Sequence, residues 1–543
     1  MDAIADAGSG VKAGRREWIG LAVLALPTLL LALDSSVLYL ALPQLSADLD
    51  AGSTQLLWIT DIYGFLIAGC LVTMGTLGDR IGRRRLLMIG AGLFALASVA
   101  AAYSTGPEML IATRALMGIT GATLMPSTLA LLSNMFRDPK QMGTAIAVWM
   151  SCFMGGMAIG PVVGGVLLEN FWWGSVFLLS VPVMGLLLLA GPRLLPEYRD
   201  PNAGKVDVLS VIMSLATILP LIYGLKELAK SGVQVTSLVA IAVGVVVGLL
   251  FVRRQRTLEH PLLDLRLFGN RSFSAALIIM VFGGVMSGTF LLINLYLQTV
   301  EGLSPLRAGL WLVPGTVATV IGLQVAPIIA RKVRPAYTIA GGLLVMAIGY
   351  ALVTQVDNST GIGLLVAGIY VSALGAGPMA GLGTGLIMAS APPEKAGSAA
   401  SLSETGGELG IALGIAAIGS VGTAVYGAQI SDAIPAGVPA QAAATASESI
   451  ASAVHVAADL PGATGAGLLA AAREAFTSAL NSGAAVSAGL AVLLAVLAAV
   501  ALRHVNPSGD HGHGGGAEES GEAAAAAGPE SEPTPPAVQV TTG

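Results

Sequence analysis

Long apolar stretches, separated by short polar segments, dominate the chain. A helix that crosses a bilayer needs about 20 predominantly apolar residues, and these stretches reach about that length. The pattern predicts fourteen membrane-spanning helices at about residues 18–42, 55–76, 84–103, 108–134, 143–168, 173–191, 207–227, 236–254, 272–299, 306–330, 338–354, 361–390, 397–426 and 480–502. We therefore expect an all-α membrane protein.

The composition supports this expectation and excludes a soluble protein. Of the 543 residues, 55% are hydrophobic and 11% are charged. A soluble domain has about 25% charged residues. The two cysteines, Cys70 and Cys152, both fall inside apolar stretches, so a disulfide framework is not expected.

The basic residues indicate how the spans are oriented. With the N-terminus inside, 22 of the 27 Lys and Arg residues lie in inner segments, 4 lie in outer ones, and Arg114 lies inside a span. Because basic residues concentrate on the cytoplasmic side of a membrane, this distribution predicts that both termini are cytoplasmic. The basic segment 253–271 is interpreted as an orientation signal that also contacts anionic lipid.

Two segments outside the predicted spans differ from ordinary loops. Segment 427–479 is long and rich in Ala, Ser and Gly, and within it 441–457 and 465–480 could each form an amphipathic helix. An outer helical hairpin and an inert Ala-rich spacer are both compatible with this pattern. Residues 506–543 are rich in Gly, Pro, Ala and Glu and contain no Lys or Arg, which predicts a disordered acidic tail.

A carboxylate inside the first span is the first indication of function. Asp34 would cost about 2.5–3.5 kcal/mol at the centre of a membrane helix, and such residues usually serve as proton or cation sites. Arg114, in the fourth span, stays charged and needs an anion, for which Asp34 is the candidate. Protonation of Asp34 would weaken this pair and bias the conformation. The alternatives are a protonated structural Asp and a permanent structural ion pair.

A glycine- and arginine-rich sequence connects the second and third spans on the inner side. It reads Gly75-Thr76-Leu77-Gly78-Asp79-Arg80-Ile81-Gly82-Arg83-Arg84-Arg85. Its glycines permit tight turns and close helix packing, and Asp79 can face the N-terminus of a neighbouring helix. The sequence resembles motif A of the major facilitator superfamily, through Gly75, Gly78, Asp79, Arg80, Gly82 and Arg83.

Three further sequences narrow the resemblance. Segment 114–121 in the fourth span resembles motif B of this superfamily. Segment 156–165 in the fifth span resembles motif C, the antiporter signature, through Gly156, Gly160, Pro161, Gly164 and Gly165. Segment 33–43 is similar to the first-span motif of the drug:proton antiporters with fourteen spans. Over about residues 15–502 the chain resembles that branch, including its QacA- and LfrA-type multidrug exporters.

The resemblance implies a domain organisation and a location. It implies the major facilitator fold, with an N-terminal segment at 1–17, a six-helix bundle at 18–191, two inserted helices at 207–254, a second six-helix bundle at 272–502 that carries an extracellular loop at 427–479, and a cytoplasmic tail at 506–543. A monomeric, multi-pass protein of the bacterial plasma (cell inner) membrane is expected.

Acidic residues inside the spans indicate the charge of the substrate. Asp61, Glu404 and Glu408 lie in predicted spans, whereas Arg114 is the only basic residue well inside one. A cavity with net negative charge and apolar walls favours lipophilic cations. Glu404 and Glu408 are four residues apart on one helical face, where like charges disfavour double ionisation.

Other residues are candidates for the wall of this cavity. Trp58 and Tyr63 could add cation–π contacts, and Asn294 could line the pocket. Ordinary packing, or a hydrogen bond between helices for Asn294, explains each of them equally well. The resemblance implies that Asp61 and Glu404 handle protons and cations.

The predicted function is multidrug efflux by proton-coupled antiport, with Asp34, Arg114, Asp61 and Glu404 in the coupling role. The resemblance implies export of quaternary ammonium compounds, ethidium and acridines, with fluoroquinolones as a further class, and hence antibiotic resistance. The sequence has no phosphate-binding loop and no soluble region of ATPase size, so an ion gradient is expected to supply the energy.

The expected partners are lipophilic cationic drugs, protons and the lipid bilayer. Nucleic acid, a cofactor and a metal ion are not expected. The alternative function is dedicated export of one endogenous antibiotic or metabolite. A membrane enzyme or receptor is the rival from another class, but the sequence offers no catalytic constellation for it.

Overall fold

The computed structural model describes residues 13–51, 53–199, 207–231, 233–258, 261–303, 305–357, 361–392 and 395–507. Within these ranges the chain is helical apart from short connections, and it has fourteen segments long and apolar enough to cross a membrane. The predicted all-α membrane fold with fourteen spans is therefore confirmed. The predictions for residues 1–12 and for most of the tail lie outside the described residues.

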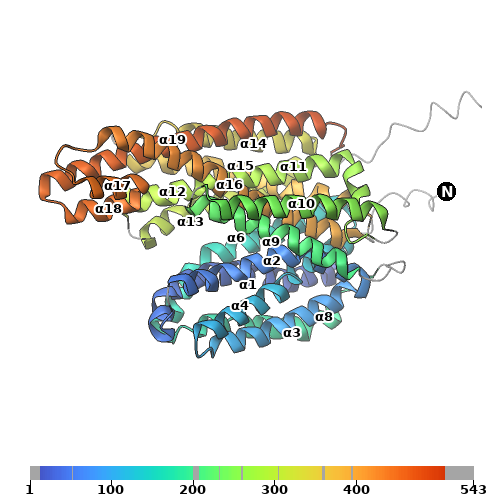
Figure 1. The fold of residues 1–543 in the computed structure, drawn as a ribbon. Helices are drawn as coiled ribbons and strands as arrows, with labels where there is room; N and C mark the ends of the chain where they lie inside the picture. The colour runs from blue at the N-terminus through green and yellow to red at the C-terminus, as the bar shows by residue number, and fades with distance from the viewer. Residues whose placement is uncertain are drawn as a thin grey trace, which may run out of the picture.

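The first half of the chain forms one group of packed helices (Figure 1). Within it α1 packs along α6, α2 along α4, and α3 along α8. Aromatic and aliphatic side chains such as Phe94, Leu124 and Phe136 are fully buried in the core of this group. The bounds are α1 (Arg15–Leu49), α2 (Ser53–Ile81), α3 (Arg83–Ala102), α4 (Pro107–Gly121), α5 (Leu124–Met135), α6 (Pro139–Asn170), α7 (Ser175–Leu178) and α8 (Ser180–Leu194).

The fourth predicted span consists of two helices, because α4 and α5 are separated by a break. Thr123 Oγ1 donates a hydrogen bond to the Thr120 carbonyl at 2.7 Å, and Thr120 Oγ1 donates to the Leu116 carbonyl at 2.9 Å. Such hydroxyls compete with the backbone amides for helical carbonyls and bend the helix. The ninth span is also divided, into α11 (Arg271–Val285) and α12 (Ser287–Thr299).

The second half of the chain forms another group of helices, which follows a short 3-10 helix, η1 (Leu265–Gly269). α11 and α12 pack on α16. α13 and α14 both pack on α15, and α14 also packs on α19. The remaining bounds are α13 (Pro305–Ile329), α14 (Pro335–Val353), α15 (Gly361–Ala389), α16 (Ala396–Ala433) and α19 (Gly462–Ala501).

Two helices between these halves form an antiparallel pair, α9 (Val208–Ser231) and α10 (Val235–Thr257). α9 packs on both α2 and α16, one helix from each half. Ile222 packs with Phe65 of α2, and Leu225 packs with Ala412 and Ala416 of α16. The inserted pair therefore covers one seam between the halves.

Segment 427–479 is helical over most of its length, in agreement with the helices that its amphipathic pattern predicts. α16 continues to Ala433, α17 (Ala440–Glu448) and α18 (Ile450–Asp459) follow, and α19 begins well before the predicted start of the last span. Figure 1 shows α17 and α18 together at one end of the bundle. The buried side chains of Ile450 and Ala453 share a core with Leu468 of α19. This packing buries the apolar side chains at the start of α19, before the predicted last span begins.

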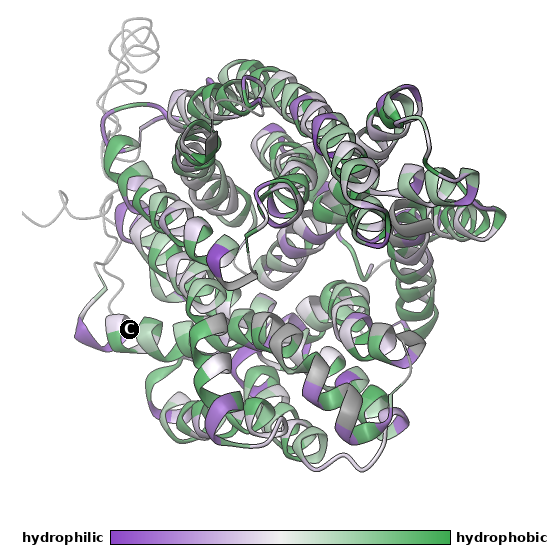
Figure 2. Cartoon of the chain, turned by 90° about the vertical axis from the view of Figure 1, so that its left-hand side faces the viewer, coloured by the Kyte–Doolittle hydropathy of each residue, from purple (hydrophilic) through white to green (hydrophobic). Residues whose placement is uncertain are grey.

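We call the end of the bundle that carries Arg15, Arg84, Arg254, Arg334 and Arg503 the basic end, and the opposite end, with α17 and α18, the hairpin end. Seen along the bundle from the hairpin end, hydrophobic residues occupy most of the helical surface (Figure 2). The halves contact each other towards the basic end. There Gln324 Nε2 of α13 donates a hydrogen bond to Ser151 Oγ of α6 at 3.0 Å, and Gly143 faces Pro327.

A polar network fixes the inserted helices at the basic end. Gln255 of α10 is 3% exposed; its side chain donates to Ser210 Oγ at 2.7 Å and accepts the backbone N–H of Leu262 at 2.7 Å. The Leu262 carbonyl accepts a hydrogen bond from Thr76 Oγ1 of α2 at 2.7 Å. Hydrogen bonds from Arg254, and then from Ser210, lower the pKa of the Asp207 carboxyl to about 2. Asp207 is therefore ionised at physiological pH.

Candidate functional site

The predicted pair of Asp34 and Arg114 is present in the structure. Arg114 Nη1 lies 2.8 Å from Asp34 Oδ2, and the two residues are 1% and 8% exposed, respectively. Arg114 Nε also donates to the Ile59 carbonyl at 3.3 Å. The pair joins α4 to α1 and α2 inside the first half. A charge-assisted hydrogen bond of this kind compensates part of the cost of burying both ions.

Aromatic rings enclose the Arg114 guanidinium. Its carbon lies 4.1 Å from the centre of the Tyr63 ring and 5.9 Å from that of Phe177. Tyr63 is 4% exposed, and among the described residues its hydroxyl has no hydrogen-bond partner. The sequence suggests Tyr63 as a substrate contact, whereas in this structure the ring covers the guanidinium. Phe177 was not a candidate, because nothing in its local sequence distinguishes it from other core residues.

We expect Tyr63→Leu to destabilise the protein and Tyr63→Phe to leave its stability nearly unchanged. A desolvated cation–π contact contributes about 2 kcal/mol, and Phe keeps the ring face whereas Leu removes it. Thermal unfolding of the purified protein in detergent, followed by size-exclusion chromatography, measures the effect. Equal losses in the two variants would show that the hydroxyl, rather than the ring, supports Arg114.

The other acidic candidates lie on α2 and α16. Asp61 precedes Tyr63 on α2 and is half-buried, Glu404 is half-buried on α16, and Glu408 is exposed one turn further along α16. Glu408 lies close enough to Glu404 and to the Tyr63 phenol to act on both electrostatically, and Asp34 and Arg114 also act on Tyr63. The structure therefore brings Glu408, from the second half, near the ion pair of the first half.

The remaining candidates for the cavity wall lie in different surroundings. Trp58 of α2 is 43% exposed, and Asn294 of α12 is half-buried. Asn294 Oδ1 accepts a hydrogen bond from Gln298 Nε2 at 2.5 Å, one turn along the same helix. This bond lies within α12 rather than between helices. Among the described residues, no group of three or more His, Cys, Asp or Glu side chains is placed to hold a metal ion.

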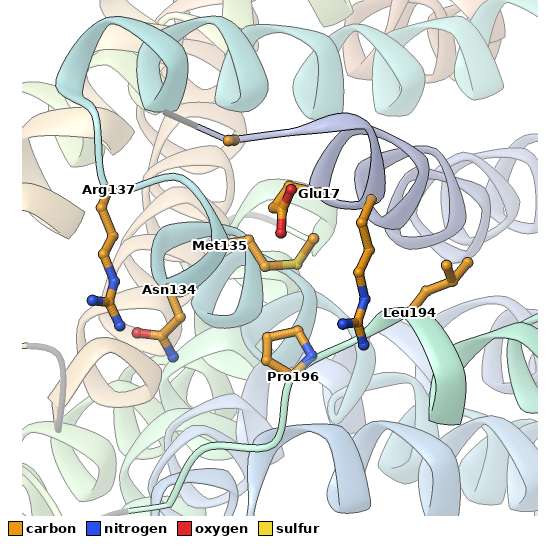
Figure 3. A pocket seen from close by; sticks show the side chains of 8 residues that line it. Glu17, Asn134, Met135, Arg137, Leu194 and Pro196 are labelled. Atoms are coloured by element: carbon orange, nitrogen blue, oxygen red, sulfur yellow. The ribbon is translucent and has the colours of Figure 1, made fainter. Parts of the chain in front are cut away.

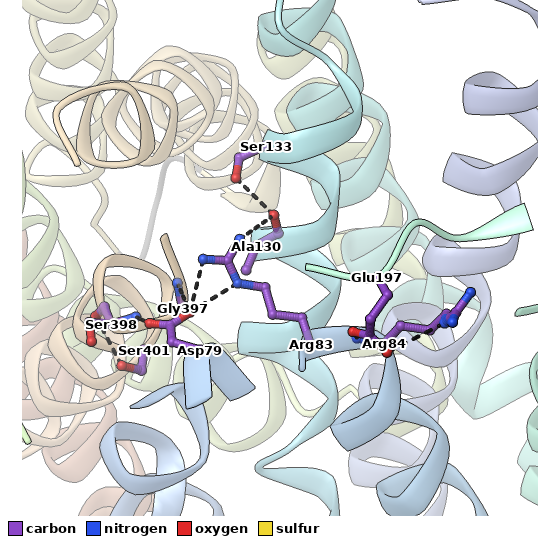
Figure 4. Close-up of polar contacts among 9 residues, drawn as sticks. All are labelled: Asp79, Arg83, Arg84, Ala130, Ser133, Glu197, Gly397, Ser398 and Ser401. Carbon is purple, nitrogen blue, oxygen red and sulfur yellow. Dashed lines mark hydrogen bonds and ion pairs between the residues drawn. The ribbon is translucent and has the colours of Figure 1, made fainter. Parts of the chain in front are cut away.

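Asp79 connects the two halves at the basic end (Figure 4). Its Oδ1 accepts the backbone N–H of Gly397 and its Oδ2 that of Ser398, both at 3.1 Å, at the start of α16. Arg83 Nε and Nη2 each lie 2.9 Å from Asp79 Oδ1. The free N–H groups and the positive end of the helix dipole favour a carboxylate at this position. We call this set of contacts the Asp79 latch.

Glycines allow the helices to approach at the latch. A Cβ on Gly75 would lie 2.5 Å from the Gly397 carbonyl oxygen, so α2 and α16 meet backbone to backbone. Gly78 lies on the opposite side, towards Leu86, and Gly82 has a φ of 109°, which favours glycine. Arg80 is half-buried at the end of α2.

The sequence did not identify Glu197, which supports the basic end after α8. Its carboxylate accepts the Arg84 backbone N–H at 3.1 Å and lies 3.5 Å from Arg84 Nε (Figure 4). A Cβ on Gly82 would lie 2.7 Å from Glu197 Oε1, so the Glu197 carboxylate would have to shift to make room for it. An acidic residue just after a span, opposite an arginine-rich turn, is the signal that could have found it.

The glycines of the motif C segment lie on α6, which packs along α1. Gly156, Gly160 and Gly164 are buried, and Gly165 is half-buried. A Cβ on Gly156 would lie 3.0 Å from Ala32 Cβ and would clash with the Leu29 carbonyl oxygen. Pro161 lies within α6, but its side chain is not among those that the structure describes. Close packing of α6 therefore holds the stretch of α1 that carries Asp34.

Comparisons with known proteins agree with this architecture. The family model described as Major Facilitator Superfamily matches residues 24–415. The multidrug efflux pump LfrA of Mycolicibacterium smegmatis is 43% identical over 492 residues, which cover 90% of this chain and 97% of that protein. The methyl viologen resistance protein SmvA of Salmonella typhimurium is 36% identical over 490 residues, which cover 89% and 97%.

A solved structure shares the fold at low sequence identity. The crystal structure of the human organic anion transporter MFSD10 superposes with a TM-score of 0.58 at 16% identity, and the match covers 89% of this chain and 99% of that one.

Proposed function

The chain belongs to the major facilitator superfamily, and on that basis we propose that it exports lipophilic cationic drugs in exchange for protons. Two relatives with nearly full-length matches carry names that describe multidrug efflux and methyl viologen resistance. Methyl viologen is a planar aromatic dication. An acidic site with apolar walls favours the binding of such a compound.

The charge balance of the central residues is the observation that carries the proposal. The guanidinium of Arg114 is matched by Asp34 at 2.8 Å, so this pair adds no net charge. Asp61, Glu404 and Glu408 lie on the two helices that meet beside it and add acidic groups. A cation that loses water on entering such a site gains attraction from these carboxylates, and an anion does not.

The same residues suggest how protons and drug exclude each other. Protonation of Asp34 removes the negative charge that balances Arg114 and leaves a net positive charge near Tyr63 and Glu408. That charge repels a bound cation and favours its release. Deprotonation restores the pair and favours binding again. Coupling energies of about 1–3 kcal/mol between two sites suffice for such exchange.

We further propose that the basic end faces the cytoplasm. The distribution of Lys and Arg along the sequence supports this orientation. In this orientation the Asp79 latch would hold the two halves together on the cytoplasmic side. Release of the latch would open the inward-facing state in which drug is loaded.

Transport by the purified protein tests this proposal. In liposomes with an imposed proton gradient, we expect the protein to move ethidium and methyl viologen against their own gradients, and a protonophore to abolish the movement. A neutral antibiotic such as chloramphenicol serves as the matched uncharged compound and is expected to be a poor substrate.

The opposite results discriminate between the rival functions. Transport of one neutral compound, with neither cation moved, would favour a dedicated exporter and contradict the cation proposal. Movement of the cations against their own gradients that persists without a proton gradient and with a protonophore present would contradict proton coupling while leaving the substrate class intact.

A further inference from the structure

A cavity lies at the basic end of the first half, and its lining contains none of the acidic residues described above (Figure 3). Its volume is about 330 Å³, and it lies between the start of α1, the end of α5 and the end of α8. The polar residues that line it include Arg16, Glu17, Asn134 and Arg137. The structure thus forms a second polar site, which the proposed transport cycle does not use.

The polar lining of this cavity consists mainly of hydrogen-bond donors. Arg137 forms no ion pair with a described residue, and Arg16 uses one N–H to donate to the Arg193 carbonyl at 2.8 Å. Asn134 Nδ2 is buried and has no hydrogen-bond acceptor among the described residues. An unpaired buried amide is costly, so an acceptor that reaches it from the cavity would stabilise this end of α5.

The acidic residue in the lining leaves the cavity with a net positive charge. Glu17 Oε2 accepts the Gly14 backbone N–H at 2.7 Å, so its carboxylate is engaged at the start of its own helix. Two guanidiniums and one carboxylate give the cavity a formal charge of about +1. This charge matches a phosphodiester, and arginine presents the donors that phosphate oxygens prefer.

The surroundings indicate a ligand with an apolar part. The rest of the wall is apolar and consists of Ala13, Met135, Leu194 and Pro196. One turn into α1, Trp18 is 36% exposed and packs edge-on against Phe136, with ring centres 5.0 Å apart. Partly exposed Trp residues at the end of a membrane helix mark the level of the lipid headgroups. The cavity therefore lies where a lipid phosphate would be.

We propose that this cavity binds the phosphate ester of an anionic phospholipid headgroup, with Arg16, Arg137 and Asn134 as donors. Basic pockets at the cytoplasmic ends of membrane helices have the chemistry for such headgroups. A bound headgroup would join α1, α5 and α8. It would add to the bond between the Ala13 backbone N–H and Gln141 Oε1, at 2.7 Å, which already ties the start of the chain to α6.

The test measures thermal stability of the full chain, purified in detergent, after addition of phosphatidylglycerol or of phosphatidylcholine. Phosphatidylglycerol is expected to raise the melting temperature of the wild type more than phosphatidylcholine does. Arg137→Gln, and the double variant Arg16→Gln/Arg137→Gln, are expected to weaken lipid binding by about tenfold or more for each guanidinium. The matched control is Arg331→Gln/Lys332→Gln, which removes two exposed basic residues at the basic end of the second half, away from the cavity.

Four outcomes decide whether the cavity binds a lipid headgroup. Loss of the extra stabilisation in the cavity variants, with its retention in the control, supports the proposal. Equal loss in cavity and control variants, or equal effects of the two lipids on the wild type, would overturn it. Stabilisation by soluble glycerol phosphate alone would retain a phosphate-ester site and overturn its assignment to lipid. Arg137 is exposed, so its single replacement tests the site even if the double variant does not fold.

Discussion

Asp34→Asn is expected to abolish gradient-driven drug export while the protein remains inserted in the membrane. The amide still accepts a hydrogen bond from Arg114, but it neither carries the balancing charge nor exchanges a proton. In a one-for-one exchange of a proton for ethidium the charges moved cancel, so the pH difference is the driving force, and one pH unit supplies about 1.4 kcal/mol, enough for about a tenfold concentration ratio. Without coupling, this ratio should fall to about 1 in an assay of ethidium accumulation in everted vesicles.

A structural role for Asp34 must be separated from a coupling role. Removing one member of a buried ion pair costs about 3–5 kcal/mol, because the remaining charge is left unbalanced. The double variant Asp34→Asn/Arg114→Gln removes both charges and should recover much of that stability, but not export. Recovery of gradient-driven export in the double variant would make the pair purely structural. Glu197→Gln, which breaks a partly exposed pair, is the control carboxylate and should export normally.

Asp79→Asn is expected to open the basic end. The carboxylate accepts two backbone N–H groups of α16 and pairs with Arg83, so its neutralisation weakens several charge-assisted bonds at once. Each such bond contributes about 1.5–3 kcal/mol. Since each 1.4 kcal/mol changes a population ratio about tenfold, a predominantly closed basic end should become predominantly open or mixed.

Distances between spin labels measure this opening. Labels at the exposed positions Arg85 and Lys332 report on opposite halves at the basic end, after Cys70 and Cys152 have been replaced. We expect a longer mean distance in Asp79→Asn than in the parent. Glu197→Gln is the matched control, because Glu197 pairs with Arg84 within one half. An unchanged distance in Asp79→Asn would show that the latch does not hold the halves together.

The buried ion pair was predictable because charges are rare and costly inside a membrane. Arg114 needs an anion, and Asp34 is the acidic residue available in the first span. The spans were predictable for the same kind of reason, since apolar length alone defines them. In both cases the residue types within a span carry the signal, whatever the packing of the spans.

Contacts between distant segments were not predictable in this way. The sequence shows that Asp79 can face a helix N-terminus, but nothing near it indicates that the helix begins at Ala396. Likewise, the Tyr63 ring covers Arg114 because α2 and α4 pack together, and the local sequence suits a substrate contact equally well. The length of α19 depends on its packing with α18, which apolar length does not capture.

Drug-driven proton movement tests the central claim most directly. Proteoliposomes containing a pH-sensitive dye, with no imposed gradient, are given ethidium on one side, and the internal pH is followed for the wild type and for Asp34→Asn. The proposal predicts proton movement opposite to ethidium in the wild type, and ethidium binding without proton movement in the variant. Equal proton movement in the two proteins would contradict the assignment of coupling to Asp34.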